Sequence, residues 1–329
     1  MHGAAKGGHL EVLKWARAHG CPWDEWTCAS AAEGGHLAVL MWAREQDCPW
    51  GAETCSRAAG SGHLEVLQWA RGRGCPRSAG TCGSAARNGH LDVLRWARDD
   101  GCEWNDFTPA CAAEGGHLVV LQWLREQGCP WNEATCRRAA AGGHLAVLQW
   151  AREHKCPWSR WTTEEAAAGG HLDVLIWARE HTCRWNKETC YAAAAAGHLE
   201  VLMWAHAHGC PCDWRACCSA ATGGQLECLK WLREQECPWG PQGGLGATIE
   251  SAAGEGHLEV IIWAVAHGCP WHDRTCRAAA ECGQLEVLKW AVAHGCPWDT
   301  NACAQVAERE GAAESCVEVA QWVRAHHAY

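Results

Sequence analysis

Aromatic residues other than tryptophan are almost missing from this sequence: its 329 residues include one Phe and two Tyr. No apolar run reaches the roughly 18 residues that a membrane-spanning helix needs. Basic residues are in the minority, with 28 Lys and Arg against 38 Asp and Glu, and a net charge of −10 argues against nucleic-acid binding. The opening residues lack the basic and apolar segments of a secretion signal. We therefore expect a protein of the cytoplasm, or alternatively of the nucleus, that binds neither membranes nor nucleic acid.

Motifs for catalysis are missing as well. The Gly-rich stretch GPQGGLG at Gly240–Gly246 lacks the Lys-Ser/Thr of a phosphate-binding loop, and no CxxC pair occurs anywhere. We expect no enzymatic activity and no cofactor. The 25 cysteines are an odd number, which fits a closed set of disulfides poorly. In a reducing compartment most of these thiols should stay reduced.

The sequence contains a repeat, rich in tryptophan (24 residues) and glycine (36 residues). We call the residue that follows the Gly of GHLEVL the marker; it recurs eight times at intervals of 27 residues and then at intervals of 32, 27 and 32. This predicts a single array of about twelve units over residues 1–329, with five-residue insertions near Gly240–Gly246 and Ala307–Ser315. The markers are His9, His36, His63, His90, His117, His144, His171, His198, Gln225, His257, Gln284 and Cys316.

The sequence of each unit predicts two helices. The longer one begins at the marker, and in the unit of His144 its apolar residues cover an arc of roughly 220° at 100° per residue: Leu145, Val147, Leu148, Trp150 and Ala151. An arc this wide requires neighbours on two sides. The shorter helix begins at the Thr of the Thr-Cys motif, which we expect to be the N-cap, and its Ala pair permits close helix packing. Since neither helix buries its apolar face alone, the units must stack into an all-α solenoid.

Two segments of the unit resemble the ankyrin repeat. The stretch GHLEVLKWARAHGCPWD at 8–24 is similar to that family's GHLEVVKLLL…GADVN, and Thr-Cys-x-x-Ala-Ala is similar to its Thr-Pro-Leu-His-x-Ala-Ala. The unit has 27 residues where the family has about 33, and the missing part corresponds to the family's β-hairpin. The resemblance implies a short ankyrin-like variant: a curved α-solenoid of helix–turn–helix units, without hairpins, that works as a non-enzymatic protein-binding scaffold or adaptor.

The repeated His and Cys suggest an alternative function, a metal-binding or redox-responsive module. Within one unit the marker and the Cys twelve residues later lie about 16 Å apart along a helix, too far to share a metal. Cysteines such as Cys21 and Cys28, at the end of one helix and the start of the next, could approach each other. The marker becomes Gln at Gln225 and Gln284 while its surroundings persist. We therefore expect the marker to form a hydrogen bond in the turn between helices rather than bind metal.

The tryptophans fall into a regular and an irregular set. Twelve lie six residues after the marker and nine follow Cys-Pro or its variant, which predicts packing in the core and loops. Trp26, Trp161 and Trp214, with Phe107 at a similar position, fall outside this pattern just before the short helix. There they are either hydrophobic staples at N′ or exposed anchors of an interface.

Partner binding is expected where the copies differ. They differ in the loop after Cys-Pro-Trp and in the first exposed pair of the short helix, such as Glu164-Glu165 and Tyr191-Ala192. These positions should form one row along the solenoid, and we expect the chain to bind a protein there as a monomer. The candidate binding residues, which we name the variable strip, are Trp26, Phe107, Arg137, Arg138, Arg160, Trp161, Lys187 and Trp214.

The terminal copies depart from the repeat. The first copy has almost no short helix before His9, and the last one, SCVEVAQW, is degenerate and reads as a C-terminal cap. An incomplete first unit favours a further alternative, in which the array is part of a larger multidomain protein.

Overall fold

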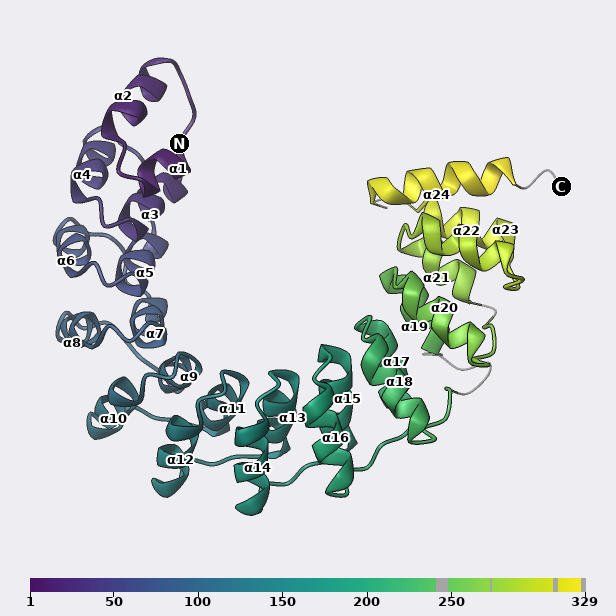
Figure 1. Cartoon of the computed structure of the whole chain (residues 1–329). Coiled ribbons are helices and arrows are strands. Elements are labelled where there is room, and N and C mark those ends of the chain that lie inside the picture. Colours follow the sequence, from purple (N-terminus) through teal and green to yellow (C-terminus); the bar gives the residue numbers. More distant parts are fainter. Residues whose placement is uncertain (241–247, 273, 310–312, 327–329) are drawn as a thin grey trace. The chain divides into compact units, whose positions relative to one another are not determined.

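The computed structural model describes residues 1–240, 248–272, 274–309 and 313–326. These residues form 24 α-helices and no strand, joined as successive helix–turn–helix pairs (Figure 1). The predicted all-α solenoid of stacked helical repeats without hairpins is thus confirmed for the part of the chain that is described.

Each pair consists of an odd-numbered helix, which is the predicted short one, and an even-numbered helix at the marker. The odd-numbered helices are α1 His2–Lys6, α3 Glu25–Glu33, α5 Ala52–Gly60, α7 Ala79–Arg87, α9 Phe107–Glu114, α11 Glu133–Ala141, α13 Arg160–Ala168, α15 Lys187–Ala196, α17 Trp214–Thr222, α19 Thr248–Glu255, α21 Thr275–Glu281 and α23 Thr300–Ala307. The even-numbered helices are α2 Leu10–Ala18, α4 Leu37–Glu45, α6 Leu64–Gly72, α8 Leu91–Asp99, α10 Leu118–Glu126, α12 Leu145–Glu153, α14 Leu172–Glu180, α16 Leu199–Ala207, α18 Leu226–Glu234, α20 Leu258–Ala266, α22 Leu285–Ala293 and α24 Glu314–Ala325.

The start of the odd-numbered helices differs from the prediction. Asp24 is the N-cap of α3, and its side chain accepts a hydrogen bond from the Trp26 backbone N–H at 3.1 Å. Asn132 caps α11 in the same way, at 2.8 Å from the Ala134 N–H. The Thr of the Thr-Cys motif, such as Thr27, is the third residue of the helix and is fully buried. Our N-cap assignment was therefore wrong, because a carboxylate or amide three residues earlier satisfies the free N–H groups. The two helices of this pair, α3 and α4, are equally long at nine residues each, so the predicted difference in length between the two helices is absent here.

The helices stack within two compact units, Met1–Thr162 and Thr163–Tyr329, whose boundary falls inside α13. In the first unit α3 packs on α5 and α5 on α7, and in the second α15 packs on α17 and α17 on α19. Each even-numbered helix of α3–α12 packs against the odd-numbered helix before it. The small Ala pairs of the odd-numbered helices, such as Ala58 and Ala59, are fully buried and allow this close stacking. A single array over the whole chain stays a prediction.

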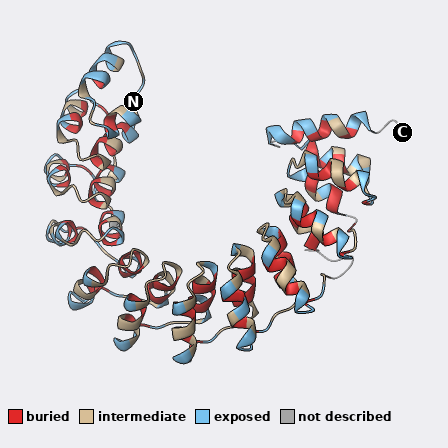
Figure 2. Ribbon diagram, in the orientation of Figure 1, coloured by how far each residue is buried: buried red, intermediate tan, exposed pale blue. Residues whose placement is uncertain are grey.

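The core follows the odd-numbered helices and one face of each even-numbered helix (Figure 2). In α12 the buried residues are Val147, Leu148 and Ala151, while Leu145 and Trp150 are only partly buried. The predicted apolar arc is therefore too wide. Even-numbered helices make few contacts with each other and bury mainly the face toward their odd-numbered partners, so the outer edges of the arc stay accessible.

The marker side chain joins successive pairs. His144 Nε2 lies 2.9 Å from the carbonyl oxygen of Glu114, the last residue of α9 in the preceding helix pair. The His ring also lies on Gly116, where an added Cβ would be 2.6 Å from His144 Nδ1. At position 284 the amide of Gln284 donates to the Gly254 carbonyl at 3.4 Å, so Gln can replace His in this role. The predicted hydrogen bond exists. At His144 and Gln284 it connects successive helix pairs, whereas at Gln225 the side-chain amide donates to the Gly223 carbonyl at 2.8 Å and closes the marker's own turn, as predicted.

Substitution of His144 tests this bond. We expect His144→Ala to lower the free energy of unfolding by about 1–2 kcal/mol, because the buried side of the Glu114 carbonyl loses its partner. His144→Gln should cost less than half as much, since Gln keeps a donor of similar reach. Urea unfolding of both variants measures the difference. Equal losses for Ala and Gln would show that ring packing, and not the hydrogen bond, is what the marker supplies.

The two insertions fall partly outside the described residues. Residues 241–247, which include most of Gly240–Gly246, are not described, and neither are residues 310–312 within Ala307–Ser315. In the described flanks of the second insertion, α23 ends at Ala307 and α24 begins at Glu314. Among the described residues no helix is long and apolar enough to cross a membrane.

Candidate functional site

The regular tryptophans form a repeated surface cluster rather than a core. None of the 24 tryptophans, all of which the structure describes, is fully buried. The Trp of one Cys-Pro-Trp loop meets the next marker-helix Trp edge to face, as in Trp50 and Trp69 with ring centroids 5.9 Å apart. The Arg near the end of the marker helix lies over the loop Trp, as Arg44 does over Trp50 at 4.4 Å. Loop packing is confirmed for these residues, but placement in the core is wrong.

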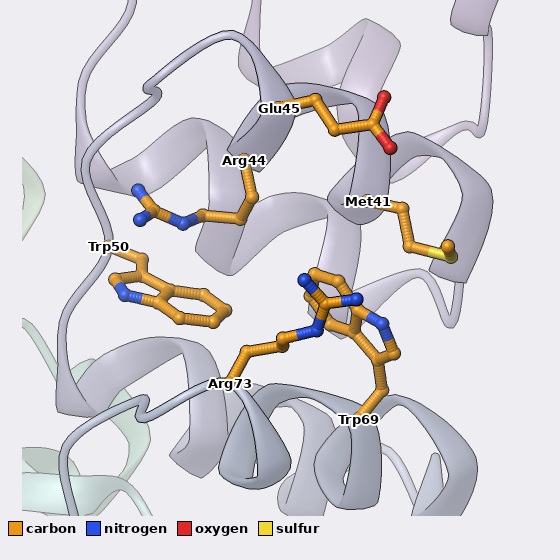
Figure 3. A pocket seen from close by; sticks show the side chains of 6 residues that line it. All are labelled: Met41, Arg44, Glu45, Trp50, Trp69 and Arg73. Carbon is orange, nitrogen blue, oxygen red and sulfur yellow. The ribbon is translucent and has the colours of Figure 1, made fainter.

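One such cluster encloses a shallow hollow of about 200 Å³, between α4 and α6 (Figure 3). Arg73 covers Trp69 at 5.6 Å on one side, while Arg44 donates a hydrogen bond to the Cys48 carbonyl on the other. Its two guanidinium groups are engaged with the framework, and the same Trp–Trp contact recurs in other repeats, for example between Trp131 and Trp150. The hollow is therefore a consequence of how the Cys-Pro-Trp loop packs onto helices α4 and α6.

The cysteines serve mainly as buried packing groups. Cys48 donates through Sγ to the carbonyl of Asp24 at 3.4 Å, which ties the loop after one helix pair to the start of its odd-numbered helix. Cys28 hydrogen-bonds with Cys48, and this contact lowers the pKa of Cys48 and raises that of Cys28. The predicted approach of Cys21 to Cys28 was therefore wrong: Cys28 meets the cysteine twenty residues later, because that loop returns to its own odd-numbered helix.

Four residues of the variable strip are exposed near the beginnings of their odd-numbered helices: Trp26, Phe107, Arg160 and Trp161. The exposed fractions of Trp26, Phe107 and Trp161 are 44%, 46% and 44%, and Arg160 is exposed as well. Trp26 is the second residue of α3, and Phe107 is the first of α9. These positions follow the N-cap, so the hydrophobic-staple interpretation, which needs N′, was wrong. Large aromatic side chains exposed to this degree are available to a partner.

Residues of the variable strip occur in each of the two compact units. Trp26, Phe107, Arg137, Arg138, Arg160 and Trp161 lie in Met1–Thr162, and Lys187 and Trp214 lie in Thr163–Tyr329. Arg137, Arg138, Lys187 and Trp214 are partly buried. Two neighbouring positions that we expected to be exposed, Glu164 and Tyr191, are 8% and 7% exposed. Each is the fifth residue of its helix, and Tyr191 contacts Asp213, the N-cap of the next odd-numbered helix α17.

Ion pairs hold the charged residues of the first unit in place. Arg57 lies over the Trp26 ring at 5.7 Å and pairs with Glu33 at 3.0 Å and Glu53 at 2.9 Å. Lys6 donates to Glu33 at 2.7 Å, and this bond, supported by Arg57, lowers the pKa of Glu33. Near Trp26 the variable strip therefore presents an exposed indole ring beside ion-paired side chains.

The same pairing continues farther along the first unit and in the second. Arg138 lies 3.7 Å from Glu114, which also pairs with Arg87 at 3.0 Å. In the second unit Lys187 pairs with Asp213 at 3.4 Å, and the Tyr191 hydroxyl donates to Asp213. Trp214 is covered by Arg215 at 5.4 Å. Two cations of the strip, Arg138 and Lys187, are thus oriented by neighbouring carboxylates.

Sequence reasoning missed a hollow over α7, which we name the α7 hollow. It has two adjoining parts, of about 540 Å³ and 290 Å³, which share Gly80, Ser84 and Arg87. Arg57 borders the larger part and Phe107 the smaller one. The hollow exists because α7, AGTCGSAAR, carries only Gly and Ser where the neighbouring helices carry larger side chains. The shortness of these side chains is the signal that could have indicated it.

Comparisons with known proteins find one local family match and similarity to solved structures. Residues 190–233 match the family described as ankyrin repeats (many copies). Among solved structures, the human ASB11 ankyrin repeat domain is similar over 57% of this chain and 96% of its own, with 15% identity and a TM-score of 0.45. No protein of the curated set matches. Ankyrin repeats generally mediate protein–protein interaction. The predicted resemblance is therefore confirmed for residues 190–233, which match ankyrin repeats directly.

Proposed function

We propose that the protein is a non-enzymatic scaffold or adaptor that binds a protein partner along the variable strip. The observation behind this is the exposure of Trp26, Phe107 and Trp161 at positions where other copies carry smaller residues. An exposed aromatic ring leaves apolar surface in contact with water, and a partner that covers the ring removes this surface from water. Tryptophan in particular is frequent among the residues that dominate binding energy.

The α7 hollow gives this surface a point of insertion. It lies between Arg57 and Phe107, so a partner side chain entering it would meet an aromatic ring on one side and a guanidinium on the other. Glu33 and Glu53 lie at the same hollow and hold Arg57 in position. This arrangement favours a protein segment with an apolar or aromatic anchor beside charged groups of both signs.

The remaining parts of the proposal follow from composition. A chain with 25 free thiols is suited to the reducing conditions of the cytoplasm or nucleus. We propose that it acts there as a monomer, with no nucleic-acid ligand, because the net charge of −10 opposes binding to phosphate backbones.

Affinity capture with matched variants tests the binding surface. The triple variant Trp26→Ala, Phe107→Ala, Trp161→Ala should lose at least about tenfold in capture of the partners of the unmodified chain, because about 1–2 kcal/mol is lost with each anchor. Quantitative mass spectrometry of immobilised chains after incubation with cell extract measures the loss.

A control triple variant removes equally exposed apolar groups from even-numbered helices: Val12→Ala, Val119→Ala, Met203→Ala. Their exposed fractions are 54%, 64% and 45%. This variant should retain the partners. Equal capture by both variants, or no partner captured by the unmodified chain, would contradict the proposed surface.

A further inference from the structure

The packing of α19 on α21 lacks an ion pair that bridges other neighbouring odd-numbered helices. In the first unit Glu33 of α3 pairs with Arg57 of α5 at 3.0 Å, and a pair at the same positions links α9 and α11 at 3.7 Å. The acid stands three residues before its marker, and the arginine stands six residues before the next marker. In α19 and α21 these two positions are Gly254 and Ala278. The chain therefore supplies neither member of the bridge here.

A hollow of about 290 Å³ lies beside Ala278, between these two helices. Its other lining residues are Glu250 of α19 and, at α21, Arg274, Arg277 and Glu281. Ala278 has only a methyl group where the bridging arginine lies in the other pairs, so the space is left open. The hollow is thus bordered almost entirely by charged side chains.

Both carboxylates at the hollow already face another group of the chain. Glu281 pairs with Arg309 at 3.1 Å. Glu250 Oε2 lies 3.4 Å from Nδ1 of His272, and the side chains of the two residues are only 15% and 5% exposed. These contacts hold the acidic groups at the edges of the hollow and leave its cations available.

The two guanidinium groups at the hollow have no such partner. Arg274 and Arg277 are exposed, and neither forms an ion pair with any residue that the structure describes. A guanidinium group can donate two parallel N–H···O bonds to a carboxylate, and such charge-assisted bonds are stronger than neutral ones. The hollow therefore offers two donors of this kind to a carboxylate from outside the chain.

We propose that the hollow between α19 and α21 binds an aspartate or glutamate side chain of a protein partner. The partner's carboxylate replaces the one that the helix pairs of the first unit supply from within the chain. A lysine or arginine of a partner would instead face two unpaired guanidinium groups. This inference rests on the proposed function in one respect, that the ligand is a segment of a protein, and it involves no residue of the variable strip.

Fluorescence anisotropy with two matched peptides tests the site on the full chain. The probe is a fluorescein-labelled peptide of alternating glycine and glutamate, and the control peptide has glutamine in place of each glutamate. We expect the glutamate peptide to bind at low salt with a Kd below about 1 mM, and the glutamine peptide to bind at least about tenfold more weakly. Because the net charge of −10 repels an acidic peptide, binding of the probe reports a local site.

The double variant Arg274→Gln, Arg277→Gln should weaken binding of the glutamate peptide at least about tenfold, because the charge-assisted bonds are lost. Both side chains are exposed, so circular dichroism should show unchanged helix content. The reversed variant Arg274→Glu, Arg277→Glu should lose the glutamate peptide and bind a peptide of alternating glycine and lysine instead.

A control double variant, Arg73→Gln, Arg95→Gln, removes the same two charges from exposed positions at α6 and α8. It should change the affinity for the glutamate peptide less than about twofold, since distant exposed charges are screened. Equal losses in the two Gln double variants would overturn the inference, because they would show attraction to the charge of the chain as a whole. Equal binding of the two peptides, or no binding of the glutamate peptide up to about 1 mM, would overturn it as well.

The variable strip can be tested apart from this hollow. The triple variant Trp26→Ala, Phe107→Ala, Trp161→Ala should bind the glutamate peptide as the unmodified chain does. Loss of partner capture with peptide binding intact then concerns the variable strip alone. Loss of peptide binding only in the variants of Arg274 and Arg277 concerns the hollow alone.

Discussion

Gly115→Ala is expected to destabilise the first unit by about 3 kcal/mol, the cost of forcing an atom into packed backbone. An added Cβ would lie 1.9 Å from the carbonyl oxygen of Arg87 and 2.6 Å from the His117 ring. The oxygen belongs to the backbone of the preceding helix pair, so it cannot rotate away. The backbone of Gly115 is itself ordinary, with φ of −82°, so any loss reports the clash alone.

Gly128→Ala is the matched control for this substitution. Nothing lies within 4 Å of its added Cβ, but its φ is +73°, in the left-handed region that favours glycine. We expect a loss of about 1 kcal/mol from the backbone conformation only. Urea unfolding of the two variants measures both costs. Losses of equal size would mean that the backbone around Gly115 and the Arg87 carbonyl shifts at little cost. The contact between them would then not fix the spacing of the helix pairs.

Leu121→Ala should cost about 3 kcal/mol, the typical loss for a buried leucine whose cavity does not collapse. Leu121 is fully buried in α10, against the odd-numbered helix α9. Because each helix pair is stabilised mainly by its neighbours, the effect should be strongest near the site. Hydrogen exchange should therefore speed up most in the amides of α9 and α10.

The same helix provides the control. Val119 is two residues from Leu121 but is 64% exposed, so Val119→Ala should change the free energy of unfolding by no more than about 0.5 kcal/mol. Similar losses at both positions would show that the outer face of α10 is covered in solution. That outcome would place a partner or a second copy on the even-numbered helices rather than on the variable strip.

Much of the fold could be predicted because the repeat applies the same local rules many times. The Leu four residues after the marker is buried in α4, α10 and α12 alike, as at Leu40, Leu121 and Leu148. The substitution of Gln284 for His predicted correctly that the marker is a hydrogen-bonding group. The periodicity, which is visible in the sequence, determines the helix type, the spacing of the helices and the positions of the Ala pairs at the stacking face.

The errors arose where two residues of similar chemistry competed for one position. Thr27 and Asp24 can both cap a helix, and only the backbone conformation shows that Asp24 does so. Trp150 counts as apolar in a helical wheel, yet it lies at the edge of the buried face. For Cys28 the nearest thiol along the sequence, Cys21, was the wrong partner, because the loop that contains Cys48 folds back.

The sequence by itself determined the repeat, the all-α class, the helix pairs and the ankyrin resemblance, since each follows from local spacing. The tertiary structure alone decided which side chains meet between pairs. It placed His144 on the Glu114 carbonyl and opened the α7 hollow beside Phe107. These contacts join residues about 20 to 30 positions apart, and only the stacking of one pair on the next sets their distance.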